Sequence, residues 1–211
     1  MGLSDGAKIE VTSAGRWGTR REMKSELDRR PEGPARQIVA AARELLEAEG
    51  AEGLSMRRIA ERLGVRAPSL YEHIPSKQAL EAALISEGLS EWAEFAGGSL
   101  AETGDGEQLT AVAHAYRGHA KDHPHLYRLM TVRPLPRDDL APNVERRATR
   151  PVVDAVGGDG GLARALWSFL HGMVINELNN RFPPGANLDA AWERGLSAFR
   201  REARWVQTVR R

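Results

Sequence analysis

Apolar side chains recur every three to four residues along most of the chain, a spacing that places them on one face of an α-helix. Residues 35–49 carry this pattern between Pro34 and Gly50, and helices favour proline at the start and glycine after the end. No segment alternates as a half-buried strand does, so the pattern predicts an all-α protein. Further helices are predicted over 56–62, from Pro68 to the residue before Pro75, from the cap Ser76 to a boundary at Gly97-Gly98, and over 106–122, 125–131, 143–156, 161–181 and 188–208.

Residues 34–80 have the outline of a helix-turn-helix unit, in which a glycine-containing turn joins two short helices. Ser55 is a good N-cap and Gly64 a good helix end, so the turn precedes the helix that Pro68 opens. The remainder, 81–211, is predicted to form a second helical domain. The residues expected to pack the short helices together are Ile59, Ala60, Leu63, Val65 and Leu70, and those expected to face outward are Arg57, Ser69, Tyr71, His73 and Lys77.

Composition narrows the possible classes of protein. The 211 residues include no cysteine, which excludes a disulfide scaffold, thiol catalysis and cysteine-ligated zinc. No apolar run reaches the ~18 residues of a membrane span, because Ser168 and His171 interrupt the best one. Residues 1–10 lack the basic start and apolar stretch of a secretory signal. We therefore expect a cytoplasmic protein with no membrane partner.

Positive charge is concentrated in residues 55–77. The whole chain has a net charge of +1, yet this window holds five basic and two acidic side chains, a net charge of +3. Residues 1–54 and 78–211 each sum to −1. A local basic patch on a helix-turn-helix suits a nucleic-acid partner.

Residues 1–33 contain few large apolar groups and are predicted to form a flexible arm, with at most a short helix around 21–29. Six basic and three acidic residues lie between Arg16 and Arg30. An arm of this kind either enters the DNA minor groove or stays a solvated tail, and the sequence favours the tail.

A set of positions within the helix-turn-helix forms a recognisable motif: Leu63-Gly64-Val65, Pro68, Leu70-Tyr71, His73 and Lys77-Gln78-Ala79-Leu80. On these residues the segment 35–85 resembles the DNA-binding domain of the TetR family of bacterial transcription regulators, and it is particularly similar to the tetracycline-repressor branch. The resemblance implies a regulator that binds double-stranded DNA by placing the third helix in the major groove.

The resemblance also implies roles for single residues. Groups that suit phosphate oxygens are a phenol, an imidazole, an ammonium and a helix N-terminus. Glu72 departs from the pattern, since its place is often aromatic in relatives. Together with the small residues Ala67 and Ser69, it leaves the operator sequence unpredicted. The implied DNA-binding residues are Arg57, reaching a base edge, Ala67, Pro68 and Ser69, meeting the bases, and Tyr71, His73 and Lys77, clamping phosphates.

The segment 161–181 carries a broad apolar stripe and the sequence Trp167-x-x-x-His171-Gly172, in which the small Gly172 is expected to let another helix approach closely. This sequence resembles the Trp-His-Gly pattern of one group of TetR-family C-terminal domains. The resemblance implies that 161–181 and 188–208 form a four-helix interface with a second copy. A homodimer reads two half-sites, so the implied DNA partner is a palindromic operator.

Residues between the two ends combine aromatic bodies with a few polar groups, the usual makeup of a small-molecule site. The resemblance implies that such a site holds an effector of unknown identity, which lowers DNA affinity by favouring a conformation with misplaced recognition helices. The candidate ligand-binding residues are Trp92, Phe95, His114, Tyr116, Arg117, Tyr127, Met130, Trp167 and His171.

Two motifs point to other chemistry and are weak. His119 and His123 lie four apart, but no Glu completes a His-Glu-x-x-His arrangement, so surface histidines at a helix C-terminus are the better interpretation. Residues 158–163 fit a Gly-x-Gly-x-x-Ala dinucleotide fingerprint, yet no repeated βαβ pattern surrounds them, and a glycine-rich loop between helices explains them. We therefore expect no catalytic residue, metal or cofactor.

The sequence therefore predicts an all-α transcription regulator, most simply a repressor that a small molecule releases from DNA. An activator and a ligand-independent regulator remain alternatives, and a nucleotide-dependent enzyme is a remote one.

Overall fold

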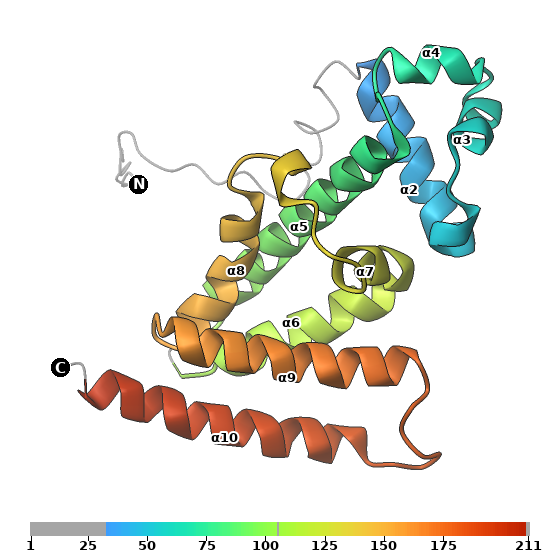
Figure 1. Cartoon of the computed structure of the whole chain (residues 1–211). Coiled ribbons are helices and arrows are strands. Elements are labelled where there is room, and N and C mark those ends of the chain that lie inside the picture. The colour runs from blue at the N-terminus through green and yellow to red at the C-terminus, as the bar shows by residue number, and fades with distance from the viewer. Residues whose placement is uncertain (1–32, 105, 210–211) are drawn as a thin grey trace, which may run out of the picture. The chain divides into compact units, whose positions relative to one another are not determined.

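The computed structural model describes residues 33–104 and 106–209, and within these ranges it contains helices and no strand (Figure 1). This confirms the all-α prediction. The arm predicted for 1–33, with its short helix, lies outside the described residues except for Gly33. The elements are α2 (Pro34–Gly53), α3 (Met56–Leu63), α4 (Ala67–Tyr71), α5 (Lys77–Ala101), α6 (Gln108–Asp122), α7 (Pro124–Thr131), the 3₁₀-helix η1 (Arg137–Asp139), α8 (Val144–Ala155), α9 (Gly160–Leu178) and α10 (Leu188–Val209).

The turn between α3 and α4 is fixed by caps at both helix ends. The Ser55 hydroxyl accepts a hydrogen bond from the Arg58 N–H at 3.4 Å, as an N-cap does. Gly64 ends α3 with a left-handed φ of 69°. The Val65 N–H then donates to the Ala60 carbonyl at 3.0 Å. The prediction that Val65 packs between the helices is wrong, because this residue lies in the turn itself and its side chain is 46% exposed.

Glycine affects two helices differently. Gly50 interrupts α2 with a φ of 75°, close to the predicted end, and one further turn runs to Gly53. By contrast, α5 continues through the exposed pair Gly97 and Gly98, where the sequence indicated a boundary. Glycine costs a helix about 1 kcal/mol per residue relative to alanine, and a packed helix of 25 residues tolerates that cost.

Two clusters of buried side chains form the core. The first lies among α2, α3, α4 and the first half of α5, and includes Leu46, Ile59 and Leu84. The second lies among α6, α8, α9, α10 and the second half of α5, and includes Leu166 and Leu196. Both α5 and α7 take part in both clusters, so the two halves of the described chain share packed helices.

The short helix α7 contributes different sides to the two clusters. Leu126 and Leu129 are buried in the first cluster, whereas Tyr127 is buried in the second. The Leu126 N–H also donates to the Glu47 carboxylate of α2 at 3.4 Å. A displacement of α7 therefore changes the packing of both α2 and the second cluster.

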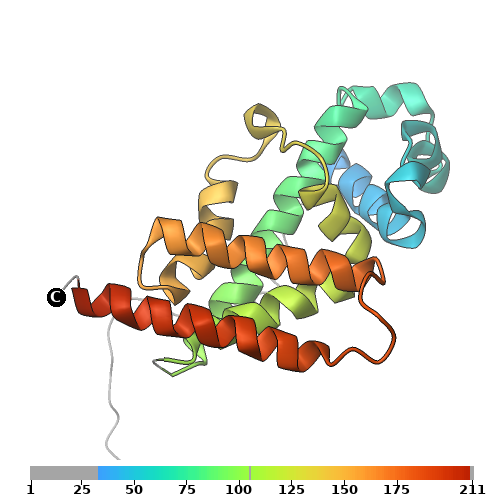
Figure 2. The same cartoon turned by 60° about the horizontal axis from the view of Figure 1, so that its bottom comes forward.

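The helices α9 and α10 lie side by side and antiparallel, as Figures 1 and 2 both show. They approach closely at Gly195 of α10, where an added Cβ would lie 2.2 Å from the Phe169 ring of α9. At Gly172 of α9, by contrast, an added Cβ would meet nothing within 4 Å, so no other helix of this copy packs against that position.

The loop between α7 and α8, residues 132–143, is fastened along the first half of α5. The Gln78 amide donates to the Asp139 carboxylate at 2.9 Å, and the Ala141 N–H donates to the Ser86 hydroxyl at 3.0 Å. Leu135 also packs against the first cluster. We call this segment the α7–α8 loop.

Candidate functional site

The residues predicted to contact DNA lie on α3, on α4, in the turn that follows α4 and at the first residue of α5. Ala67, Pro68 and Ser69 form the first turn of α4, next to α3. Tyr71 ends α4 with 49% of its surface exposed. The side chains that solvent reaches freely are Arg57, Pro68, Tyr71, His73 and Lys77, while Ala67 and Ser69 are half-buried. His73 lies beyond the end of α4, which is shorter than the sequence indicated.

Ion pairs reduce the positive charge that this surface offers. Arg58 forms a bidentate hydrogen-bonded pair with Glu49 of α2, and the Arg58 hydrogen bond lowers the pKa of the Glu49 carboxyl. The Nε–H and Nη2–H groups of Arg62 both donate to one carboxylate oxygen of Glu44 of α2. Two of the five basic residues in 55–77 therefore hold α3 against α2.

The other three cations of the window remain accessible to an anion. Arg57 lies 3.4 Å from Glu61, and Lys77 lies 3.7 Å from Glu81, distances and exposures typical of weak surface pairs. Arg66 immediately precedes α4, and no ion pair involves it among the described residues. In the sequence, Arg57 and Arg66 precede the first turn of α4, and Lys77 follows it.

A second feature is a cavity of about 550 Å³, which we call the central cavity. This volume lies within the range of small-molecule sites, roughly 300–1,000 Å³. Five of the nine predicted ligand-binding residues line it: Trp92, Tyr116, Tyr127, Met130 and Trp167. The rest of the wall consists of Leu89, His119, Thr131, Arg133, Leu135, Arg137, Glu145, Ala148, Thr149, Val152, Val153, Gly160, Ala163 and Arg164.

The polar groups in the aromatic part of the wall hydrogen-bond to each other. The Tyr116 and Tyr127 hydroxyls are 3.0 Å apart, and the Tyr127 hydroxyl lies 2.7 Å from Nδ1 of His171. The Trp92 Nε1–H donates to the Ala148 carbonyl at 2.9 Å. Burial raises the pKa of Tyr116 to about 12 and lowers the pKa of His171, so near neutral pH these groups are uncharged.

His119 is the exception in this wall. Its Nε2 atom is buried without a hydrogen-bond partner, and its ring lies about 6 Å from those of Trp92 and Phe95. Burial, together with the neighbouring His123, lowers the pKa of His119. The interpretation of His119 as a surface histidine is wrong, because its ring turns toward the cavity.

Four predicted ligand-binding residues do not line the central cavity. Phe95 is largely exposed, and His171 lies behind Tyr127. His114 and Arg117 lie on the side of α6 that faces α10. Arg117 forms ion pairs there with Glu177 and Asp189 at 3.0 and 2.8 Å.

Sequence reasoning missed all four charged residues of the wall, which are Arg133, Arg137, Glu145 and Arg164. They lie on the α7–α8 loop, on α8 and on α9, and no local spacing brings them together. One signal was available, because Arg164 precedes Trp167 by three residues and therefore lies on the same helical face.

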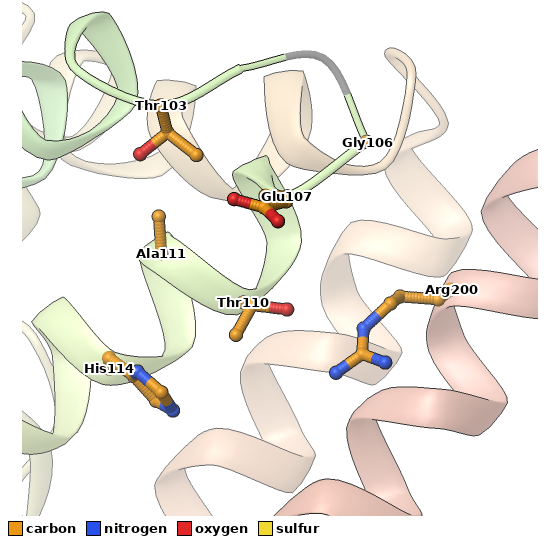
Figure 3. Close-up of a pocket in the computed structure, with 7 residues that line it drawn as sticks. All are labelled: Thr103, Gly106, Glu107, Thr110, Ala111, His114 and Arg200. Atoms are coloured by element: carbon orange, nitrogen blue, oxygen red, sulfur yellow. The ribbon is translucent and has the colours of Figure 1, made fainter.

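His114 lines a different hollow, of about 490 Å³, between the start of α6 and α10 (Figure 3). In Figure 3 the Arg200 side chain extends from α10 toward Thr110 and His114 of α6. Arg200 donates to Glu193 at 3.0 Å. Because polar side chains dominate this hollow, an apolar ligand fits the central cavity better.

The two weak motifs acquire a structural explanation. Residues 151–155 belong to α8, so no strand precedes the glycines; Gly157 and Gly158 lie between α8 and α9, and Gly160 and Gly161 begin α9. His119 and His123 have neighbouring rings, with centroids 5.2 Å apart. Within the part of the chain that the structure describes, no three His, Cys, Asp or Glu side chains are arranged to hold a metal, and no helix is long and apolar enough to cross a membrane.

Known families and proteins match both halves of the described chain. The family described as "Bacterial regulatory proteins, tetR family" matches residues 38–84, and "Tetracyclin repressor-like, C-terminal domain" matches residues 109–199. An uncharacterised HTH-type transcriptional regulator of Mycobacterium tuberculosis is 31% identical over 149 residues, which are 67% of this chain and 68% of that protein.

Two further similarities concern tetracycline repressors. The tetracycline repressor protein class C of Escherichia coli is 53% identical over 47 residues, 22% of each chain. A solved structure of a TetR variant from Acinetobacter baumannii AYE, in complex with minocycline, matches with a TM-score of 0.59 and 23% identity. It covers 82% of this chain and 97% of that one. At that identity the match supports the fold alone.

Proposed function

The chain belongs to the TetR family of bacterial regulatory proteins, and we propose that it is a homodimeric repressor of transcription. In this proposal it binds a palindromic DNA operator through α4 and leaves it when a small molecule occupies the central cavity. The observation that carries the proposal is that α7 contributes to the core beneath α2–α4 and also to the wall of that cavity.

The proposed DNA contacts follow the exposure of the helix-turn-helix. The first turn of α4, with Ala67, Pro68 and Ser69, meets base edges in the major groove, and Arg57 of α3 reaches one further base. Tyr71, His73 and Lys77 hold phosphates on either side. Arg66, exposed beside α4, joins the phosphate contacts. The small side chains of α4 allow its backbone to approach the bases closely.

The proposed release mechanism depends on α7 and the α7–α8 loop. Tyr127 and Met130 of α7 line the central cavity, while Leu126 and Leu129 of the same helix support α2 and α5. A ligand that displaces α7 therefore strains the packing beneath α4. The ligand shifts the population away from the DNA-binding arrangement only if it binds the other arrangement more tightly. The minocycline complex of the A. baumannii relative gives a precedent for a ligand in this fold.

The proposed dimer interface is the outer side of α9 and α10. Gly172 faces open space there, and the neighbouring Ala165 and Ser168 of α9 are small and exposed. On α10, Trp205 exposes 61% of its surface, a large apolar area for a residue of a single copy. A second copy packed on these helices forms a four-helix bundle, and a two-fold dimer places two α4 helices about 34–36 Å apart, or a multiple of it.

Substitution of Gly172 by arginine is expected to convert the dimer to a monomer without unfolding it. The single copy has free space at this position, so only a partner helix would meet the new side chain. Analytical ultracentrifugation of wild type and variant measures the change, and circular dichroism checks the helix content. Gly97→Arg, at another open helical glycine, is the matched control and should remain dimeric. A wild-type protein that sediments as a single copy of 23.2 kDa at micromolar concentration would contradict the dimer.

The proposed function as a whole is tested by selecting, from sheared genomic DNA, the fragments that the full chain retains. We expect a few fragments that share one palindrome. A reporter gene behind that palindrome then distinguishes a repressor from an activator, because loss of the chain raises expression in the first case and lowers it in the second. Retention of random fragments only would refute the proposal, and would reopen the remote alternative of an enzyme.

A further inference from the structure

The interior of the central cavity sets one requirement on its ligand. The hydroxyls of Tyr116 and Tyr127 are already hydrogen-bonded, and the Trp92 indole N–H is bonded to a backbone carbonyl. A polar ligand group placed against them loses its hydration and gains few partners in return, which is unfavourable. His119 Nε2 leaves room for one hydrogen-bonding group. The body of the ligand therefore has to be mainly apolar.

The charged residues of the cavity wall set a second requirement. Three are arginines, Arg133, Arg137 and Arg164, and one is acidic, Glu145. The Arg137 guanidinium donates to Glu145 at 3.1 Å, so these two charges offset each other. Arg133 lies 3.7 Å from Glu81 and is largely exposed, and no ion pair involves Arg164 among residues 33–104 and 106–209. Two arginines thus remain for an anion.

We infer that the effector is an organic acid, with an apolar body in the cavity and an anionic group, such as a carboxylate, held by Arg164 and Arg133. This inference rests on the proposed function, since it takes the central cavity as the effector site. A guanidinium matches a carboxylate with two parallel hydrogen bonds. Because Arg133 and Arg164 are exposed, the acid keeps part of its hydration and no isolated charge is buried.

Arg133 also connects the acid to the surface proposed to contact DNA. Glu81 of α5 lies 3.7 Å from Arg133 and 3.7 Å from Lys77, through different carboxylate oxygens. An acid that draws Arg133 toward the cavity leaves Glu81 paired with Lys77 alone. Lys77 is then held more firmly by a protein carboxylate, and its ammonium is less available to a phosphate. Effector binding and phosphate binding are therefore expected to oppose each other.

Isothermal titration calorimetry of the full chain near neutral pH, without DNA, tests the charge requirement. The probes are two matched series with one apolar body each: decanoate, decanamide and decylamine, and 2-naphthoate, 2-naphthamide and 2-naphthylmethylamine. In at least one series we expect the acid to bind about tenfold more tightly than the amide, and the amine not to bind. If in neither series the acid binds more tightly than its amide and its amine, or if neither acid binds at millimolar concentration, the inference is overturned.

A pair of variants tests the role of Arg164. Arg164→Gln should weaken binding of the acid about tenfold and leave binding of the amide unchanged, because only the charged partner is lost. Arg146→Gln, an exposed arginine on α8 that does not line the cavity, should bind the acid as wild type does. An equal loss of affinity for the acid in both variants would mean that general surface charge causes the effect, and would also overturn the inference. Retention of palindromic DNA by a chain that fails these titrations would leave the proposed function intact.

Discussion

Alanine in place of Lys77 is expected to weaken binding to every DNA duplex by about tenfold, whatever the sequence. The ammonium at the start of α5 is exposed and its contact with Glu81 is weak, so a phosphate can compete for it. Loss of one phosphate contact should also reduce the slope of log affinity against log salt concentration by about 1. Titration of a labelled duplex at several salt concentrations, followed by fluorescence anisotropy, measures both quantities.

Arg57→Ala separates base contacts from phosphate contacts in the same assay. This variant should bind more weakly and should also lose about 1–3 kcal/mol of discrimination at one base pair, because a base edge carries sequence information and a phosphate does not. Lys121→Ala, an exposed cation on α6, is the control and should bind as wild type does. Unchanged affinity for all duplexes after Lys77→Ala would refute the phosphate contact assigned to that residue.

Valine in place of Gly88 is expected to lower the free energy of unfolding by about 1–3 kcal/mol. This glycine lies where α5 crosses α7, and an added Cβ would lie 2.6 Å from the Met130 sulfur and 2.7 Å from a Leu126 methyl carbon. Leu126 is fully buried, so it has little room to retreat. The valine therefore has to push α7 away from α5, and urea unfolding followed by circular dichroism measures the cost.

A matched substitution on the same helix separates the effect of crowding on stability from the effect of valine itself. Gly97→Val introduces the same side chain where nothing lies within 4 Å, and should change stability by no more than about 0.5 kcal/mol. Because α7 carries Tyr127 and Met130, Gly88→Val should also alter the central cavity. Equal stability of the two variants would mean that α5 and α7 do not meet as described.

Local sequence rules predicted the helices well, because each amphipathic face, cap and breaker acts within a few residues. Ser55 and Gly64 placed the ends of α3 correctly for this reason. The wrong predictions concern features that depend on how residues distant in sequence pack together. Gly97 and Gly98 look like a break in sequence, yet α5 is long enough to run through them. Likewise, nothing local indicates that α9 and α10 approach each other closely at Gly195.

The cavity was only half predictable for a related reason. Large aromatic residues such as Trp92 and Tyr116 are candidates for any apolar site, so composition identifies them. The arginines of the cavity wall come from separate elements. Whether they lie near one another depends on how the α7–α8 loop is fastened to α5. Sequence spacing carries no information about such distant pairs. His119 was misjudged because a position near a helix C-terminus does not reveal which side of the helix is covered.

The ion pairs between α2 and α3 bear on how such a regulator divides its time along a chromosome. A genome offers about 10⁶–10⁹ competing sites, and attraction to any of them comes mostly from cations that meet phosphates. Arg58 and Arg62 are held by Glu49 and Glu44, so they add little to that indiscriminate attraction. In the proposed complex a larger share of the binding energy then depends on the bases assigned to α4. We therefore expect fewer copies to stay bound to random sequence, so that a small number of molecules suffices to occupy one operator.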